Sequence, residues 1–282
     1  MIQSIVVIGA GTMGNGISHV FAQYGYKVTI VDIAQSSLDK GLTNITNNLS
    51  RQVKKGTLTE DQMSATLANI SLSTDLASVA PKANLIIEAA SEDINVKKKI
   101  FTQLDAICPD TTIFATNTSS ISITDLAAVT KRADKFIGMH FFNPVPVMKL
   151  VELIRGIATS NETHDVIHSL SLAIEKVPVS VQDYPGFISN RVLMPMINEA
   201  IYCLMEGVAS AEDIDTVMKL GMAHPMGPLT LADFIGLDVC LAIMEVLHNG
   251  YSDSKYRPCP LLRKMVAAGY MGRKSGKGFF TY

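Results

Sequence analysis

Short apolar runs alternate with amphipathic stretches through residues 2–182 of the chain. This alternation predicts strands joined by helices, the pattern of βαβ units and a parallel sheet. The first run, "IQSIVVI", ends at Gly9 and is typical of a buried parallel strand. Similar runs follow at residues 27–32, 84–89, 111–117 and 135–142, and residues 12–25 should form a helix that ends at Gly25.

Residues 36–69 interrupt the alternation with a helical insertion. The pattern predicts two helices joined at Gly56, and Thr59 with Gln62 has the spacing of a capping box for the second helix. The insertion is longer than a simple crossover requires. We therefore expect it to contribute to binding.

Strand patterns stop near residue 182, and only helical patterns follow. Residues 185–207 are apolar nearly all round, so we expect a long buried helix. "SAEDIDTVMKLG" predicts a helix with Ser210 as N-cap and Gly221 at its end, and "LADFIGLDVCLAIMEVLHNG" predicts another helix. The chain should thus contain an α/β domain at 1–183 and an all-α domain at 184–282.

Composition excludes several classes of function. The 282 residues are 48% hydrophobic and 18% charged, which suits large cores. The net charge of −2 provides no basic field for nucleic acid or an anionic membrane. The cysteines form neither a C-x-x-C pair nor a zinc-spaced cluster, so we expect no disulfide and no metal site. Without a signal peptide pattern or a membrane-spanning run, the expected location is cytoplasmic.

The motif "GAGTMG" follows the first strand and opens a helix, as a dinucleotide-binding turn does. Gly9 permits the tight turn, Gly11 lets the backbone approach a pyrophosphate, and Gly14 lets the helix pack closely. The helix that begins with Thr12 and Met13 would offer N–H groups to the phosphates. The first domain is therefore expected to be a Rossmann-type, mostly parallel sheet that binds a dinucleotide.

Asp32 lies 18 residues after Gly14, at the end of the second strand. A carboxylate there can accept hydrogen bonds from a ribose 2′-OH and would repel a 2′-phosphate. Asp32 therefore favours NAD over NADP. The alternative is that it only caps the following turn.

His140 ends the apolar run 135–142, and "NPVP" then prevents a helix. In open α/β sheets, ligands bind at this carboxyl edge. A dehydrogenase that acts on a secondary alcohol needs a base for the hydroxyl proton, and histidine suits that role. The alternative is a histidine that is simply part of the core.

Glu152 stands in the apolar run "KLVELI", where a carboxylate needs a partner. We expect it to orient His140 in a dyad shielded from water, although an exposed strand residue remains possible. Ser119, in "TNTSS", and Asn190, in "PGFISNR", are weaker candidates for hydrogen bonds to a substrate. Their alternatives are helix capping for Ser119 and a buried structural role for Asn190.

Together, "GAGTMG", "NTSS", "HFFNPVPVMKLVE", "PGFISNR", "HPMGPL" and "GRKSGKGFF" carry a resemblance that runs over residues 2–282. The chain resembles the short-chain L-3-hydroxyacyl-CoA dehydrogenases. This resemblance implies an NAD-dependent enzyme that interconverts 3-hydroxyacyl-CoA and 3-ketoacyl-CoA, with 3-hydroxybutyryl-CoA and acetoacetyl-CoA as the expected pair.

The resemblance also implies roles for individual residues. His140 would be the base and Glu152 its partner, while Ser119 and Asn190 would hydrogen-bond the reacting group. Asp32 would bind the ribose. Further cofactor contacts would come from Glu92, Lys97, Asn117 and Lys274.

In the family, the helical insertion helps to hold coenzyme A, and the all-α domain forms a homodimer. Lys54 or Lys55 would then bind CoA phosphates, although both lysines could equally belong to a solvated helix face. Two rival functions remain. One is a dehydrogenase of the same build for sugar acids, and the other is a non-catalytic NAD(H)-binding protein, which would not need the four candidate catalytic residues.

Overall fold

The strands of the first part of the chain form a single eight-stranded sheet in the computed structural model, which describes residues 2–282. The chain divides into two units, one that ends at Asp183 and one that covers Tyr184–Tyr282. The sheet has the order β3-β2-β1-β4-β5-β6-β7-β8. The strands are β1 (Ser4–Ile8), β2 (Lys27–Val31), β3 (Ile70–Ser73), β4 (Leu85–Glu88), β5 (Ile113–Thr116), β6 (Phe136–Phe141), β7 (Leu150–Arg155) and β8 (Val177–Gln182).

All neighbouring strands are parallel except β6 and β7, which are antiparallel. The predicted mostly parallel sheet is therefore confirmed. Chain order reverses beside β1, since β2 and β3 lie on one side of it and β4 on the other. The carboxyl ends of β1 and β4 thus flank a topological switch point, where open α/β sheets bind ligands.

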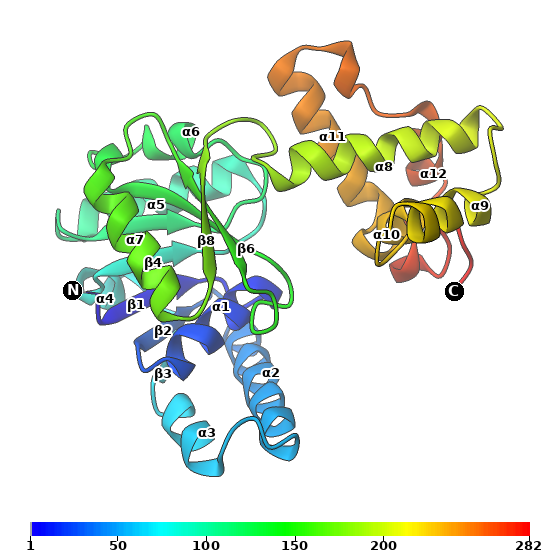
Figure 1. Cartoon of the computed structure of the whole chain (residues 1–282). Helices are drawn as coiled ribbons and strands as arrows, with labels where there is room; N and C mark the ends of the chain where they lie inside the picture. The colour runs from blue at the N-terminus through cyan, green and yellow to red at the C-terminus, as the bar shows by residue number, and fades with distance from the viewer. Residues whose placement is uncertain (1) are drawn as a thin grey trace. The chain divides into compact units, whose positions relative to one another are not determined.

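Helices connect the strands and cover the sheet (Figure 1). They are α1 (Thr12–Gln23), α2 (Gln35–Lys54), α3 (Glu60–Leu67), α4 (Leu76–Val79), α5 (Ile94–Ile107), α6 (Ile123–Ala127) and α7 (Asn161–Ala173), with 3₁₀ turns at Ala80–Lys82 and Ala133–Lys135. Strands β4 and β6 are buried along their whole length, as expected for central strands with both faces covered.

The helical insertion consists of α2 and α3, which project from the body of the sheet unit (Figure 1). Helix α2 buries one stripe of residues at helical spacing: Leu38, Gly41, Ile45 and Leu49. The connection passes through Gly56 at φ +71°, and Thr59 and Gln62 form the predicted capping box. The strand that follows, β3, was not predicted. It has four residues, none of them fully buried, so its apolar signal is weak.

The second unit is built from helices α8 (Ser189–Met205), α9 (Ala211–Thr216), α10 (Pro228–Ile235), α11 (Leu237–Tyr251) and α12 (Pro260–Ala267). A single π-helical turn, Val217–Gly221, extends α9 to the predicted end. The predicted N-cap is confirmed, because the Ser210 side chain accepts a hydrogen bond from the Asp213 N–H.

Two predictions for this unit were wrong in part. The stretch expected to form one helix after residue 230 is broken at Gly236, whose φ of +105° ends α10 and starts α11. The long helix α8 buries only one face within the chain. Its opposite face includes Val192, which is 67% exposed.

The capping box of α3 generates a first prediction. Replacing Thr59 with Ala removes a side-chain acceptor for the Gln62 N–H, which lies 3.1 Å away. We expect α3 to lose about 1 kcal/mol, so that its backbone amides exchange hydrogen about fivefold faster. Ser64→Ala, on the exposed side of the same helix, is the matched control. Equal exchange rates in the two variants would contradict the prediction.

Candidate active site and cofactor cleft

The three glycines of the first turn are required for different physical reasons. Gly9 has φ +102°, and a Cβ there would lie 2.5 Å from the carbonyl oxygen of Ala89 after β4. A Cβ on Gly14 would lie 1.8 Å from the Gly9 oxygen, so α1 packs on the turn only without one. At Gly11 nothing lies within 4 Å, which leaves the backbone open to a ligand. No side chain caps the N-terminus of α1, where Thr12 and Met13 begin the helix.

Asp32 follows β2 and holds two backbone segments together. One carboxylate oxygen accepts the Ala10 N–H at 2.9 Å, and the other accepts the Ala34 N–H at 3.2 Å. Asp32 therefore braces the glycine turn as well as capping its own turn. An ionised carboxylate has about four acceptor positions, so capacity remains for ribose hydroxyls.

These groups line a cavity of about 960 Å³ that includes the glycine turn, Asp32, Thr74, Asp75 and the segment 89–91 after β4. The volume lies at the upper end of the range of small-molecule sites. The open approach at Gly11, the helix N-terminus and the carboxylate at the end of β2 fit a dinucleotide.

His140 and Glu152 form a buried pair across β6 and β7. They are direct partners in the antiparallel register, and His140 Nδ1 lies 2.8 Å from Glu152 Oε2. The side chains are only 10% and 3% exposed. A carboxylate accepts hydrogen bonds, so the contact places a proton on Nδ1. The structure thus brings together the two residues of the predicted dyad.

Side chains on both sides fix the segment around His140. Asn117, after β5, accepts a hydrogen bond from the Phe141 N–H at 2.9 Å. Beyond the strand, Lys176 Nζ donates to the carbonyl oxygens of Val145 and Met148 at 2.6 and 2.7 Å. Burial lowers the pKa of Lys176. No sequence pattern had singled out this lysine.

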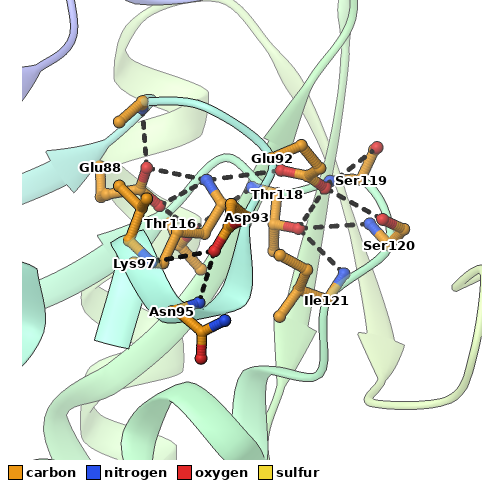
Figure 2. Close-up of polar contacts among 12 residues, drawn as sticks. Glu88, Glu92, Asp93, Asn95, Lys97, Thr116, Thr118, Ser119, Ser120 and Ile121 are labelled. Atoms are coloured by element: carbon orange, nitrogen blue, oxygen red, sulfur yellow. Dashed lines mark hydrogen bonds and ion pairs between the residues drawn. The ribbon is translucent and has the colours of Figure 1, made fainter. Parts of the chain in front are cut away.

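A network of charged and hydroxyl side chains lies at the carboxyl ends of β4 and β5 (Figure 2). Lys97, in the first turn of α5, donates to both oxygens of Glu88 at 2.8 Å and lies 3.4 Å from Glu92. The Glu88 and Lys97 side chains are 0% and 1% exposed, whereas Glu92 is 40% exposed. Glu88 was not predicted. The signal was available, because it is a carboxylate at the end of the apolar run "LIIE".

Glu92 contacts the loop that contains Ser119. Its Oε1 accepts hydrogen bonds from the Thr118 hydroxyl at 2.5 Å, the Ser119 N–H at 3.0 Å and the Ser120 hydroxyl at 3.0 Å. Partial burial opposes ionisation of Glu92, but Lys97 and these hydrogen bonds prevail and lower its pKa.

The remaining candidates lie elsewhere. Lys54 and Lys55 are exposed at the C-terminal end of α2. A second cavity, of about 230 Å³, is lined instead by Asn48 and Arg51 of α2 and by residues 143–146. In the second unit, Asn190 is buried in the first turn of α8, and Lys274 pairs with Asp238 at 2.5 Å.

Within residues 2–282, no group of three or more His, Cys, Asp or Glu side chains could hold a metal ion. No helix in the same range is both long and apolar enough to span a membrane.

Comparison with known proteins places this geometry in a family. Two family models match the chain: the NAD binding domain of 3-hydroxyacyl-CoA dehydrogenase over residues 4–184, and the C-terminal domain of the same enzyme over residues 186–282.

Individual proteins of known name are similar to this chain along its full length. A "probable 3-hydroxybutyryl-CoA dehydrogenase" of Bacillus subtilis is 56% identical over 281 residues, which cover 100% of this chain and 98% of the relative. The 3-hydroxybutyryl-CoA dehydrogenase of Bradyrhizobium diazoefficiens is 52% identical, with 100% and 96% covered. The crystal structure of (S)-3-hydroxybutyryl-CoA dehydrogenase from Ralstonia eutropha has a TM-score of 0.98 and 53% identity, with 100% and 99% covered.

The glycine turn is suited to a dinucleotide, and a buried histidine–carboxylate pair lies at the same edge of the sheet. Two family models together span residues 4–282. The chain therefore belongs to the 3-hydroxyacyl-CoA dehydrogenase family and is an NAD-dependent oxidoreductase.

Proposed function

We propose that this enzyme interconverts 3-hydroxybutyryl-CoA and acetoacetyl-CoA, with His140 as acid and base and Glu152 as its partner. The main support for these roles is the buried contact of 2.8 Å between His140 and Glu152 at the carboxyl edge of the sheet. The short-chain substrate is supported by the relatives from Bacillus, Bradyrhizobium and Ralstonia, which are named for it.

In the oxidative direction, His140 Nε2 removes the proton of the 3-hydroxyl group. The NAD⁺ that the glycine turn and Asp32 would hold would supply the acceptor for the hydride that leaves C3, so that the C3–O bond would become a carbonyl. Glu152 keeps the proton on Nδ1, so that Nε2 is the nitrogen that acts as the base, and Glu152 then stabilises the imidazolium. In the reductive direction, the imidazolium returns its proton to the 3-keto oxygen.

Ser119 and Asn190 are proposed to hydrogen-bond the reacting oxygen. The Ser119 N–H donates to Glu92 Oε1 at 3.0 Å and the Ser119 hydroxyl donates to the same oxygen at 3.4 Å. These contacts support a fixed orientation for this residue, whose hydroxyl oxygen can still accept a hydrogen bond. Asn190 is buried in the first turn of α8. A buried amide side chain is suited to a defined polar contact rather than to solvation.

The proposed cofactor contacts begin in the large cavity, which Gly9, Gly11, Thr12, Met13 and Asp32 line. Gly9, Gly11, Thr12, Met13 and Gly14 would receive the pyrophosphate, and Asp32 a ribose. Glu92 is exposed enough to accept a hydrogen bond from a second ribose. Lys97, in α5, and Asn117, after β5, would support this surface, since each is already bonded to protein groups. Lys274 is the proposed contact from the second unit.

The coenzyme A moiety is proposed to lie along α2. Lys54 and Lys55 follow Arg51 by three and four residues, so each can lie beside Arg51 at the C-terminal end of α2. Arg51 also lines the smaller cavity. These cations offer charge-assisted contacts to the CoA phosphates. We further propose a cytoplasmic, reducing setting, which the free thiols of all four cysteines support.

We predict a preference for NADH over NADPH. Asp32 lines the cavity beside the glycine turn, and a 2′-phosphate placed there would meet a like charge. Assayed with acetoacetyl-CoA, kcat/KM should be at least about tenfold higher with NADH, and Asp32→Asn should narrow the ratio. Asp39→Asn removes a nearby charge on α2 outside the cavity lining and should not. An equal kcat/KM with NADPH would show that Asp32 does not select against the 2′-phosphate.

We also predict a homodimer formed through the second unit. This unit exposes large apolar side chains that a monomer would leave in water: Val192, Val208, Val217, Leu220, Met222 and Phe234. Light scattering at micromolar concentration should give twice the chain mass. Val192→Glu should weaken the dimer, whereas Ile157→Glu, at an exposed apolar site of the first unit, should not. A monomeric wild type would contradict the prediction.

The main test concerns the dyad. His140→Gln should lower kcat by about 10²–10⁴-fold, the usual contribution of a positioned base, with little change in NADH affinity. Glu152→Gln should also act mainly on kcat, because it removes the charge that supports the imidazolium. If the residues act as a unit, the double variant should lose far less than the product of the two single losses.

A second histidine–carboxylate contact provides the control. His164 Nδ1 lies 3.0 Å from Asp165, on α7. His164→Gln should keep kcat within about twofold of the wild type, because His164 lies near the start of α7, which follows the carboxyl end of β7, away from His140 and the glycine turn. Near-full activity of His140→Gln would show that His140 is only a core residue. If the loss of kcat in the double variant equals the product of the two single losses, His140 and Glu152 act separately. The dyad proposal would then be wrong, but His140 could still be the base.

A further inference from the structure

Glu88 is a fully buried carboxylate that the proposed chemistry does not use. It ends β4, is 0% exposed and is not part of the lining of the large cavity. Burying an ionised carboxylate is costly unless its oxygens are paired and hydrogen-bonded. Glu88 meets this demand with partners from three segments, so its placement has consequences beyond its own strand.

The first set of partners is close and well directed. Glu88 accepts hydrogen bonds from Lys97 Nζ on both oxygens at 2.8 Å, from the Thr116 hydroxyl at 2.6 Å and from the Ala90 N–H at 2.7 Å. Lys97 belongs to α5, Thr116 ends β5, and Ala90 belongs to the segment that lines the cofactor cavity.

Two routes lead from these partners to the same loop (Figure 2). Lys97 lies 3.4 Å from Glu92, and Glu92 accepts hydrogen bonds from Thr118, Ser119 and Ser120. Independently, the Thr116 hydroxyl accepts the Thr118 N–H at 3.3 Å while it donates to Glu88.

Lys97 is shared between two carboxylates that differ in exposure. The contact of Lys97 with Glu88 is shorter than its contact with Glu92, and both of its side chains are buried. It therefore holds the Lys97 ammonium in a fixed position next to Glu92. From there Lys97 favours the ionised form of Glu92, whose hydrogen bonds to the loop strengthen when the acceptor is charged. Without Glu88, the ammonium would move toward Glu92 and compete with the loop for its oxygens.

We propose that Glu88 is a positioning residue for the reaction, which holds Lys97 and Thr116 so that Glu92 and Thr118 fix the loop 118–120 and aim Ser119 at the reacting oxygen. This inference rests on the proposed function of Ser119. Glu88 itself touches neither the cavity nor the reacting atoms, so its effect passes through Lys97 and Thr116.

The test combines Glu88→Gln with Ser119→Ala in a double-mutant cycle, with kcat and KM for acetoacetyl-CoA at saturating NADH. A hydrogen bond to a charged group contributes enough that Glu88→Gln should lower kcat by about 10–100-fold. If Glu88 acts through Ser119, the double variant should be no slower than Ser119→Ala alone, within about threefold. Multiplying losses would overturn the proposal.

Two further variants separate positioning from folding. Glu88→Gln combined with Lys97→Met removes the buried charges together, which preserves folding better than removing one partner. It should melt near the wild-type temperature and still lose kcat. Thr116→Val keeps the side-chain shape and removes the second route together with one hydrogen bond to Glu88. It leaves the route through Lys97 and should therefore cause a smaller loss of kcat. Wild-type kcat in the folded charge-free variant would overturn the proposal.

The matched control is the Arg132–Asp105 pair at the other end of α5. Arg132 Nε donates to Asp105 at 2.8 Å, and both side chains are less than 10% exposed. Asp105→Asn should lower the melting temperature but leave kcat within about twofold. If it lowers kcat as much as Glu88→Gln, the effect is a general loss of packing and the inference is wrong.

Two failures remain distinguishable. If Ser119→Ala is impaired and Glu88→Gln is not, the positioning role of Glu88 is wrong and the proposed function stands. If Ser119→Ala keeps full activity, the proposed role of Ser119 is wrong and the inference about Glu88 fails with it.

Discussion

Parallel strands bring their carboxyl ends to one edge of a sheet, and the candidate site depends on this constraint. The glycine turn follows β1, Asp32 follows β2, Glu88 ends β4 and Thr116 ends β5. These positions are far apart in the sequence, but sheet order places them side by side: β2, β1, β4 and β5 are consecutive. The hydrogen bonds from Thr116 to Glu88 and from Ala10 to Asp32 each join neighbouring strand ends. The backbone ladder therefore determines which side chains can cooperate.

Charges buried at this edge are stabilised in pairs, and each pair also orders backbone. Glu88 with Lys97 ties α5 to β4 and β5, and His140 with Glu152 links two strands. Lys176 is held by the carbonyl oxygens of the segment after β6. Such interactions add little net stability because desolvation opposes them. Their contribution here is to define one arrangement of the loops at the ends of these strands.

Local patterns in the sequence were sufficient for the sheet class, the helical insertion and its capping box, because each depends on residues close together in the chain. The pairing of His140 with Glu152 could also be anticipated, since a carboxylate in an apolar strand requires a partner. Strand β3 could not, because a short edge strand is only half buried and its polar residues blur the pattern. The break at Gly236 and the hydrogen bonds of Glu88 involve tertiary neighbours that no local pattern reveals. The Leu237 N–H, just after the break, donates to the Met271 carbonyl oxygen, and Thr116 donates to Glu88.

The one antiparallel pair in the sheet has a further consequence. Because β7 is antiparallel to β6, β7 starts at the edge of the sheet where β6 ends. A residue near the start of β7 therefore lies at that same edge. A parallel β7 would have carried Glu152 to the opposite edge and would have needed a long crossover. The histidine and the carboxylate are therefore contained in one contiguous hairpin, residues 136–155. Both residues of the pair are thus encoded within one short segment of the gene. Recombination would therefore transfer or delete them together more readily than it would separate them.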